Sequence, residues 1–275
     1  SIIHSKVMSD LEIYCVTNKR INILENFKYK LAIVGLEKFE NNYLRSDKGK
    51  NIFDKEKYYS ELTFHYWYWK NKLDLSNQNW VGFCQKRRFW IKKNFKDISI
   101  NIDNFKESLL IEPDPTWCNY ESIICNPISV REVKNSKLIK RGWKSILSDP
   151  SILINKNKKN LLLHFDMHHG HGNLKKAISV MNNKYKHEFY DYVSNTSILH
   201  PNIMCISKTK ILNHWFDDLF EWLFNCEKLF GFENLKGYDT GRLYAYLAER
   251  FLPFWFKKNT KYLEWPWVFF ENYDK

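Results

Sequence analysis

Two short segments of the sequence gather side chains that could do chemistry. In the first, Lys86, Arg87 and Arg88 follow the apolar run 80–84. If that run is a strand of an α/β sheet, these cations lie at its carboxyl edge, where such sheets bind ligands. Arg87 and Arg88 could grip a phosphate or a carboxylate there with paired hydrogen bonds. The alternative is a solvated basic turn.

The second segment, residues 164–173, holds four histidines and one aspartate. An extended chain would place Asp166 and His168 on the same side, a spacing that suits either a metal pair or a general-base pair. Gly170 and Gly172 would let the backbone turn tightly there. A structural or surface histidine cluster is the alternative, because the spacing matches no zinc-type pattern.

A weaker candidate lies where the first apolar run ends. Thr17, Asn18 and Lys19 follow the run 11–16 and could contact a nucleotide base or a phosphate. An ordinary loop after a first strand would look the same.

Runs of strand length must position these segments, and they alternate with stretches of helical character. The runs are 11–16, 31–36, 80–84, 109–111, 161–165 and 203–206. Residues 57–72, with Asp54 as a possible N-cap, are the first clear helical stretch. Strands that alternate with helices predict an α/β fold.

The last third of the chain has a different pattern. Apolar residues in 214–230 recur near the helical period, and a second helix is expected from about Thr240 until Pro253 interrupts it. We therefore expect a single domain over 9–275, with an α/β core at about 9–207 and a helical C-terminal part at about 208–275.

The chain is strongly basic, with 43 Lys and Arg against 31 Asp and Glu and a formal net charge of +12. Nucleic acid, an anionic membrane surface or a diphosphate-containing substrate would each suit that charge, as would a Lys- and Asn-rich composition without a specific partner. The six cysteines form no C-x-x-C pair, so reduced thiols are expected. With neither a membrane-spanning apolar stretch nor a signal peptide, the sequence predicts a soluble cytoplasmic protein.

Four motif pairs together resemble a bacterial family, catalogued as a domain of unknown function, that occurs in capsule and exopolysaccharide loci and is similar to type-A glycosyltransferases. They are ELT at 61–63 with YWYWKN at 66–71, VGFC at 81–84 with RRF at 87–89, FDMHHG at 165–170 with GN at 172–173, and EWLF at 221–224 with LAERFLP at 247–253. The chain departs from the family at Gln85, where His is usual, and at Lys86, which replaces an aromatic residue.

The resemblance implies a mostly parallel, Rossmann-like sheet with a C-terminal helical layer, and a nucleotide-sugar donor at the carboxyl edge of the sheet. The implied activity is that of a hexosyltransferase-like enzyme that moves a sugar, from a UDP-sugar in the first instance, to a capsular or exopolysaccharide acceptor. That acceptor is a glycan or a lipid-linked glycan, so a peripheral contact with the inner face of the cytoplasmic membrane is an open option. No nucleic-acid partner is expected.

Roles for individual residues follow from these segments. The expected donor-binding residues are Thr17, Asn18, Lys19, Glu61, Thr63, Tyr66, Lys70, Asn71, Arg87 and Arg88. The residues expected on the acceptor side, or in support of the site, are His168, His169, His171, Asn173 and Arg250. If the reaction inverts the anomeric centre, a base must accept the proton of the acceptor, and Asp166 is the first choice and Glu249 the second.

Type-A glycosyltransferases usually hold Mn²⁺ or Mg²⁺ with an Asp-x-Asp motif, and no convincing motif of this kind stands at a strand end here. We therefore hypothesise that Arg87 and Arg88 replace the metal at the departing diphosphate. The competing hypothesis is that Asp166 binds Mn²⁺ or Mg²⁺ together with His168 or His169.

Two other functional classes stay open. The chain could be a non-catalytic carbohydrate-binding or scaffold module of a larger capsule enzyme. A nucleic-acid-binding protein is disfavoured, because the basic residues are scattered and the sequence contains no recognised binding motif.

Overall fold

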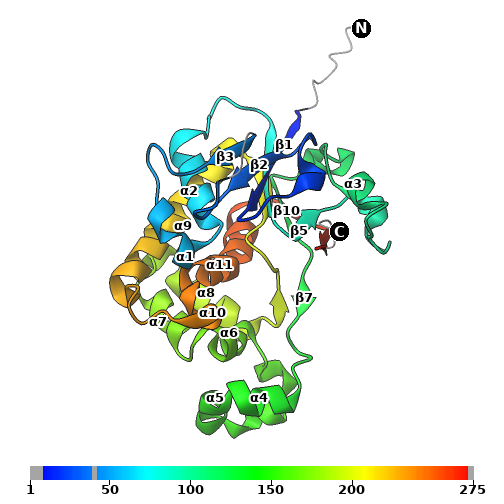
Figure 1. The fold of residues 1–275 in the computed structure, drawn as a ribbon. Helices are drawn as coiled ribbons and strands as arrows, with labels where there is room; N and C mark the ends of the chain where they lie inside the picture. The colour runs from blue at the N-terminus through cyan, green and yellow to red at the C-terminus, as the bar shows by residue number, and fades with distance from the viewer. Residues whose placement is uncertain (1–8, 39–41, 272–275) are drawn as a thin grey trace.

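A nine-stranded sheet forms the centre of the computed structural model, which describes residues 9–38 and 42–271 (Figure 1). Seven strands lie in the order β10-β6-β9-β4-β1-β2-β3, and β5 with β11 forms a branch from β4. Their bounds are β1 Leu11–Thr17, β2 Lys30–Ile33, β3 Tyr43–Arg45, β4 Trp80–Gln85, β5 Arg88–Trp90, β6 Ser122–Cys125, β9 Cys205–Lys208, β10 Tyr262–Trp265 and β11 Trp267–Phe269. A separate pair joins β7 Ile128–Ser129 to β8 Ile198–Leu199.

The sheet is mostly parallel, which confirms the expected fold class. β1 is parallel to both β2 and β4, whereas β9 is antiparallel to β4 and β6. The chain builds β1, β2 and β3 outward in one direction and then returns to place β4 on the other side of β1. The strand order therefore reverses between β1 and β4, which is the position where open α/β sheets bind ligands.

The central strands β1 and β4 read as near-continuous apolar runs because helices and loops cover both of their faces. Gly82 in β4 is required by close packing, since a Cβ there would lie 2.8 Å from Cγ1 of Ile206. Glycine thus lets β9 pack closely against the middle of the sheet.

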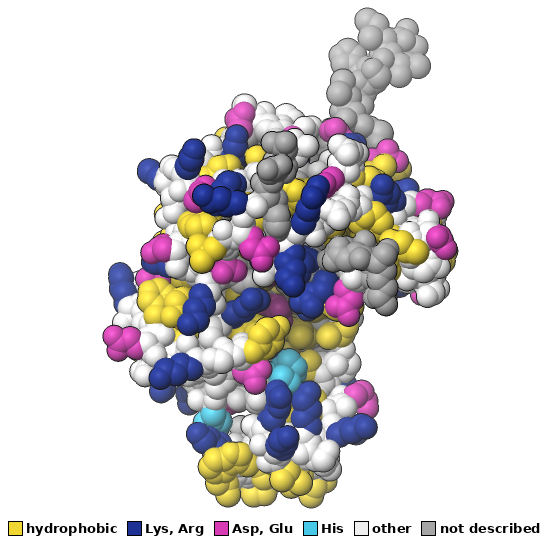
Figure 2. All heavy atoms as spheres, in the orientation of Figure 1, with side chains coloured by type: hydrophobic (Ala, Val, Ile, Leu, Met, Phe, Trp, Pro, Cys, Tyr) yellow, Lys and Arg dark blue, Asp and Glu magenta, His cyan; other side chains and the backbone are white. Residues whose placement is uncertain are grey.

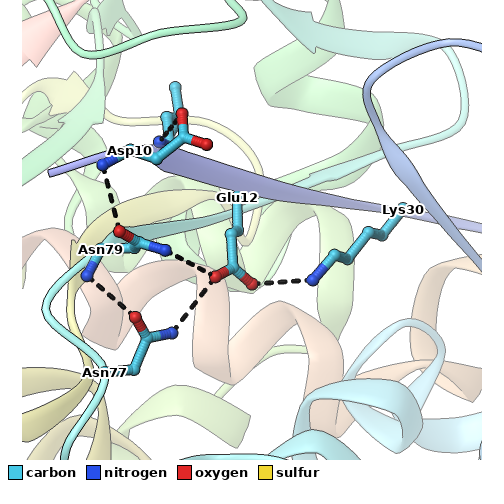
Figure 3. A network of polar contacts seen from close by, with 6 residues as sticks. Asp10, Glu12, Lys30, Asn77 and Asn79 are labelled. Atoms are coloured by element: carbon cyan, nitrogen blue, oxygen red, sulfur yellow. Dashed lines mark hydrogen bonds and ion pairs between the residues drawn. The ribbon is translucent and has the colours of Figure 1, made fainter.

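A polar network closes the amino edge of the sheet (Figure 3). Glu12 on β1 accepts a hydrogen bond from Lys30 on β2 at 2.8 Å and another from Asn79 at 3.0 Å. Asn79 in turn accepts from the backbone N–H of Asp10 at 3.1 Å. These bonds tie β1 to β2 and to the loop before β4 at the edge opposite the carboxyl ends.

The helices cover the sheet and build a layer on one side of it (Figure 1). Their bounds are α1 Glu56–Tyr59, α2 Leu62–Asn71, α3 Phe105–Ser108, α4 Asn135–Arg141, α5 Trp143–Ser148, α6 Leu161–His169, α7 Asn173–Ser179, α8 Asn183–Asn195, α9 Thr209–Phe230, α10 Gly237–Gly241 and α11 Leu243–Asn259. Aromatic rings join the layers: Phe216 of α9 lies 5.8 Å from Phe83 of β4, measured between ring centroids. No helix in the described part of the chain is both long and apolar enough to span a membrane.

The run 161–165, expected to be a strand, is instead the first half of α6. The side chain of Asn160 caps this helix by accepting a hydrogen bond from the N–H of Leu163 at 2.9 Å. Because α6 is helical, Asp166 and His168 do not project to the same side, as an extended chain would require.

Two other expectations about local structure were wrong. The run 109–111 is not a strand, and Leu109 makes only an isolated bridge to Ile91. α11 continues through Pro253 to Asn259, because the helix packs against α9 on both sides of the proline. Trp215 of α9 lies 5.6 Å from Phe251 before the proline and 5.5 Å from Trp255 after it, between ring centroids. The C-terminal part also contains β10 and β11 beside its helices.

Candidate functional site

A cleft opens at the carboxyl edge of β1 and β4, where the strand order reverses. Val16 and Gln85, the partners at the end of this strand pair, both line it. The charged side chains of the lining are Lys86, Arg87, Arg88 and Arg242, with Glu56 and Glu61 beside them. Among the described residues that line the cleft, cations therefore outnumber carboxylates two to one, which suits an anionic ligand.

The turn between β4 and β5 presents most of these cations. The backbone N–H of Lys86 donates to the carbonyl of Val16 at 2.9 Å, and its Nζ donates to Oδ1 of Asn18 at 2.8 Å. Arg87 lies in the left-handed region with φ 73°, a conformation that costs energy for a non-glycine residue. The turn is thus fastened to the end of β1, with Arg87 held at its tip.

Arg87 and Arg88 have few partners within the described residues. Nη1 of Arg87 is 3.6 Å from Oε2 of Glu271, and both side chains are about half exposed. The guanidinium of Arg88 lies 5.4 Å from the ring centroid of Phe269. Neither arginine forms a bidentate pair with a carboxylate of residues 9–38 and 42–271, so both guanidinium groups have hydrogen-bond donors to offer a ligand.

Two buried polar atoms of the lining residues lack a hydrogen-bond partner in the described part of the chain. They are Oε1 of Gln85 and Nε of Arg87. Buried polar groups are nearly always paired, so an unpaired acceptor and an unpaired donor in the lining of one cleft call for an explanation. A ligand that completes the site would supply both partners.

The carboxylates enter the cleft from the α1–α2 corner. Ser60 lies between these helices with φ 51°, and this sharp corner lets Glu56 and Glu61 line the same cleft. Burial raises the pKa of Glu56, with the neighbouring charge of Glu61 adding to the effect and that of Arg242 opposing it. A carboxylate with a raised pKa is a better proton acceptor than an ordinary one.

The far wall of the cleft comes from α10 and was missed by the sequence analysis. Tyr238 and Arg242 line the cleft from this side. Nδ1 of His169 on α6 lies 3.0 Å from the carbonyl of Asp239, and the hydroxyl of Tyr246 donates to the carbonyl of Tyr238 at 3.0 Å. His169 also stacks on Tyr246, with centroids 3.7 Å apart. His169 therefore lies behind the cleft wall and holds α10 in place.

The rest of the histidine segment lies outside the cleft lining. Oδ1 of Asp166 accepts a hydrogen bond from the N–H of Gly172 at 3.0 Å, and its Oδ2 is 3.5 Å from Nδ1 of His171. Nδ1 of His168 is 2.9 Å from the carbonyl of His164 on the preceding turn. These contacts order the α6–α7 corner, where Gly172 adopts φ 78°.

Arg250 and Glu249 also lie outside the cleft lining. The Arg250 side chain is buried, and its Nη1 donates to Oε1 of Glu249 at 2.7 Å. Its Nη2 lies 2.9 Å from Nδ1 of His164. Burial, together with the charge of Arg250, lowers the pKa of His164 to about 2, so this imidazole is neutral and accepts the arginine hydrogen bond.

Of the expected donor-binding residues, Thr17, Asn18, Glu61, Arg87 and Arg88 meet in the cleft. The other five are not among the lining residues of the cleft. The N–H of Lys19 donates to Oγ1 of Thr17, Oγ1 of Thr63 donates to the carbonyl of Ser60, Tyr66 packs on Phe220, Lys70 lies over the ring of Trp69, and Asn71 bonds the backbone of Lys50.

The residues present do not form a ready divalent-cation site. Within residues 9–38 and 42–271, no group of three or more His, Cys, Asp or Glu side chains is arranged to hold a metal ion. The side chains of Asp166, His168 and His169 are directed to different partners. Among the described residues that line the cleft, Glu56 and Glu61 are the only acidic ones, and four cations line it with them.

The comparisons with known proteins identify a family and a solved structure of similar fold. A family described as Domain of unknown function (DUF4422) matches residues 12–260. The chain belongs to this family. Among solved structures, the DUF4422 chain is similar to the apo structure of WbbM, a bifunctional glycosyltransferase, with a TM-score of 0.72 and 20% identity over 96% of this chain and 46% of that one. It thus spans about half the length of WbbM, and the likeness shows a shared fold. No curated protein matches it.

Proposed function

We propose that this DUF4422 chain is a glycosyltransferase that moves a sugar from a nucleotide-sugar donor to a glycan acceptor. The proposal rests on one observation: Lys86, Arg87, Arg88 and Arg242 line a cleft at the point where the strand order reverses. A nucleoside diphosphate is the leaving group of such a transfer, and it gains negative charge as the glycosidic bond breaks. Fixed cations that meet this charge in the transition state accelerate the reaction. The fold shared with WbbM is consistent with this role.

The proton of the acceptor hydroxyl needs a base if the anomeric centre is inverted, and we assign this role to Glu56. Glu56 lines the cleft, and burial raises its pKa. Asp166 and Glu249 do not line the cleft, and their role as the base stays a prediction. Glu56→Gln is expected to lower kcat by roughly 10²- to 10⁴-fold with little change in donor affinity. Parallel kinetics of Asp166→Asn and Glu249→Gln test the assignment, which is wrong if either of these, and not Glu56→Gln, abolishes turnover.

The finer identity of the substrates rests on the family resemblance. A UDP-sugar is the proposed donor, and a capsular or exopolysaccharide glycan, free or lipid-linked, is the proposed acceptor. Such a reaction would take place on the cytoplasmic side, at the inner face of the membrane. Screening identifies the nucleotide.

A donor screen tests the proposal directly. UDP-, GDP-, CMP- and dTDP-sugars are compared by thermal shift and by donor hydrolysis, with and without Mn²⁺, because a bound donor raises the unfolding temperature. One donor class is expected to stabilise the wild-type chain and to be hydrolysed. Arg131→Ala, at an exposed arginine outside the cleft lining, is the matched control for cleft variants. Donor binding without hydrolysis or transfer would favour a non-catalytic sugar-binding module.

A further inference from the structure

A small helical lobe projects from one end of the molecule, at the bottom of Figure 1. This tip lobe comprises residues 134–159, with α4, α5 and the short 3₁₀ turns Pro150–Leu153 and Lys156–Lys158. Leu138 and Ile152 pack inward against Leu163 and Met167, where α6 supports the lobe. The lobe therefore has its own small core, and its outer surface is not needed to complete the core of the main domain.

The outer surface of the tip lobe exposes large apolar side chains. The exposed fractions are 58% for Ile139, 52% for Trp143, 73% for Leu147 and 87% for Ile154. Trp143 and Leu147 are one turn apart on α5, so they share a face. Figure 2 shows hydrophobic side chains gathered at this end of the molecule, with Lys and Arg side chains next to them.

The same lobe holds much of the positive charge of the chain. Residues 134–159 contain eight Lys and Arg but only one acidic residue, Asp149, which pairs with Lys158. The exposed lysines without an ion-pair partner among the described residues are Lys134, Lys137, Lys140, Lys144 and Lys156. Over half of the formal net charge of +12 therefore lies in this short segment.

We propose that the tip lobe docks on an anionic phospholipid surface. Exposed Trp, Leu and Ile beside a cluster of lysines is the composition of interfacial membrane anchors, in which apolar side chains enter the headgroup boundary while lysines contact lipid phosphates. Trp suits that boundary because its ring is apolar and its N–H is polar. A second copy of the chain is a less suitable partner for the tip lobe, because a symmetric contact would place two strongly positive surfaces against each other.

Docking here would place the cleft close to the lipid surface. Nη1 of Arg141 in the tip lobe lies 4.0 Å from Oδ2 of Asp239 on α10, the helix that supplies Tyr238 to the cleft wall. α6 contacts both α4 and α10. A lipid-linked acceptor held in the membrane would then reach the cleft from the same side. This last step rests on the proposed function, whereas the docking itself does not.

Vesicle sedimentation tests the docking. The full chain is mixed with phosphatidylcholine vesicles, with or without about 30 mol% phosphatidylglycerol, and binding to the mixed vesicles alone is expected. Each basic residue near such a surface is worth about fivefold in partition, so Lys140→Gln/Lys144→Gln should reduce partition by roughly twenty-five-fold. Trp143→Ser/Leu147→Ser should reduce it by at least about tenfold, because the buried apolar area is lost.

Matched controls separate specific docking from general charge and hydrophobicity. Lys106→Gln/Lys210→Gln removes two exposed lysines outside the lobe, and Leu75→Ser/Ile98→Ser removes two apolar side chains that are each 49% exposed. Both controls should bind like wild type, and thermal unfolding checks that every variant is folded. Equal binding by the lobe variants and the controls would overturn the proposal.

Other outcomes identify other partners. A concentration-dependent dimer that Trp143→Ser/Leu147→Ser converts to monomer, without vesicle binding, would show an interface between copies and overturn the proposal. Binding of random RNA that depends on the lysines but not on Trp143 and Leu147, again without vesicle binding, would overturn it as well. Because vesicle binding is scored without turnover, its failure is distinguishable from a failure of the proposed glycosyl transfer.

Discussion

Replacement of Arg88 by alanine gives the sharpest test of the cationic cleft. Arg88 opens β5 and lines the cleft, and its guanidinium contacts the ring of Phe269. Arg87 is a poorer target, because it lies in the left-handed region and is 3.6 Å from Glu271. Arg88→Ala therefore removes one charge from the cleft while the turn keeps its tip residue.

The size of the effect follows from the charge balance of the cleft. One positive charge at about 5 Å from a phosphate oxygen contributes about 1 kcal/mol in a water-like medium and about 3 kcal/mol at an effective dielectric constant near 20. Arg88 is half-buried, so about 2 kcal/mol is expected, which corresponds to roughly thirtyfold. The effect stays moderate because Lys86, Arg87 and Arg242 remain.

The assay measures kcat/KM for donor hydrolysis and the dissociation constant of the matching nucleoside diphosphate. Arg88→Ala should weaken both by roughly thirtyfold, whereas Arg88→Lys, which keeps the charge but loses the paired donors, should lose less than about tenfold. Arg131→Ala should match wild type. If Arg88→Ala also matches wild type in both measurements while its unfolding temperature is unchanged, the cleft does not bind the diphosphate and the reasoning is wrong.

Three further measurements probe other features of the chain. Donor hydrolysis should continue undiminished in excess EDTA if the cations hold the diphosphate, and a rate restored only by Mn²⁺ would contradict this. Burial lowers the pKa of His65 from 6.5 to about 3, so the unfolded state takes up a proton that the folded state does not, and stability should fall as the pH drops from 6.5 toward 3. Between pH 6.5 and 5, the free energy of unfolding measured with denaturant should change less steeply with pH in His65→Leu than in wild type, by up to about 1.4 kcal/mol per pH unit. Equal slopes in the two proteins would refute the lowered pKa of His65. Of the six free thiols, Cys118 is exposed and five are buried. A thiol reagent should therefore modify one cysteine in the native protein and six after unfolding. Rapid reaction of more than one thiol in the native protein would contradict the burial of the other five.

The position of the cleft could be predicted from the sequence because its main signal is local. The apolar run 80–84 is followed at once by Lys86, Arg87 and Arg88, and a strand fixes which edge such residues occupy. The same logic placed Thr17 and Asn18 at the end of β1. The register that pairs Val16 with Gln85 then brings both groups to one cleft.

The run 161–165 shows where local pattern fails. Leu161, Leu162, Leu163 and Phe165, four apolar residues within five, suit a buried strand and a buried helix equally well. The deciding signal was Asn160, whose side chain caps the first turn of α6. The proline in α11 misled in a similar way, since the packing of Trp215 on both sides of Pro253 stabilises the helix across the lost hydrogen bond.

The wrong prediction of a strand at 161–165 also hid the far wall of the cleft. The sequence predicts a helix from about Thr240, but nothing near it in the sequence connects Tyr238 or Arg242 to Arg88. The connection is tertiary: because α6 is a helix, its last residue His169 reaches the carbonyl of Asp239 and stacks on Tyr246. A strand at 161–165 would leave α10 without this support. Within the histidine segment, His169 thus supports the cleft wall through α10, whereas a direct role of the segment in the reaction stays a prediction.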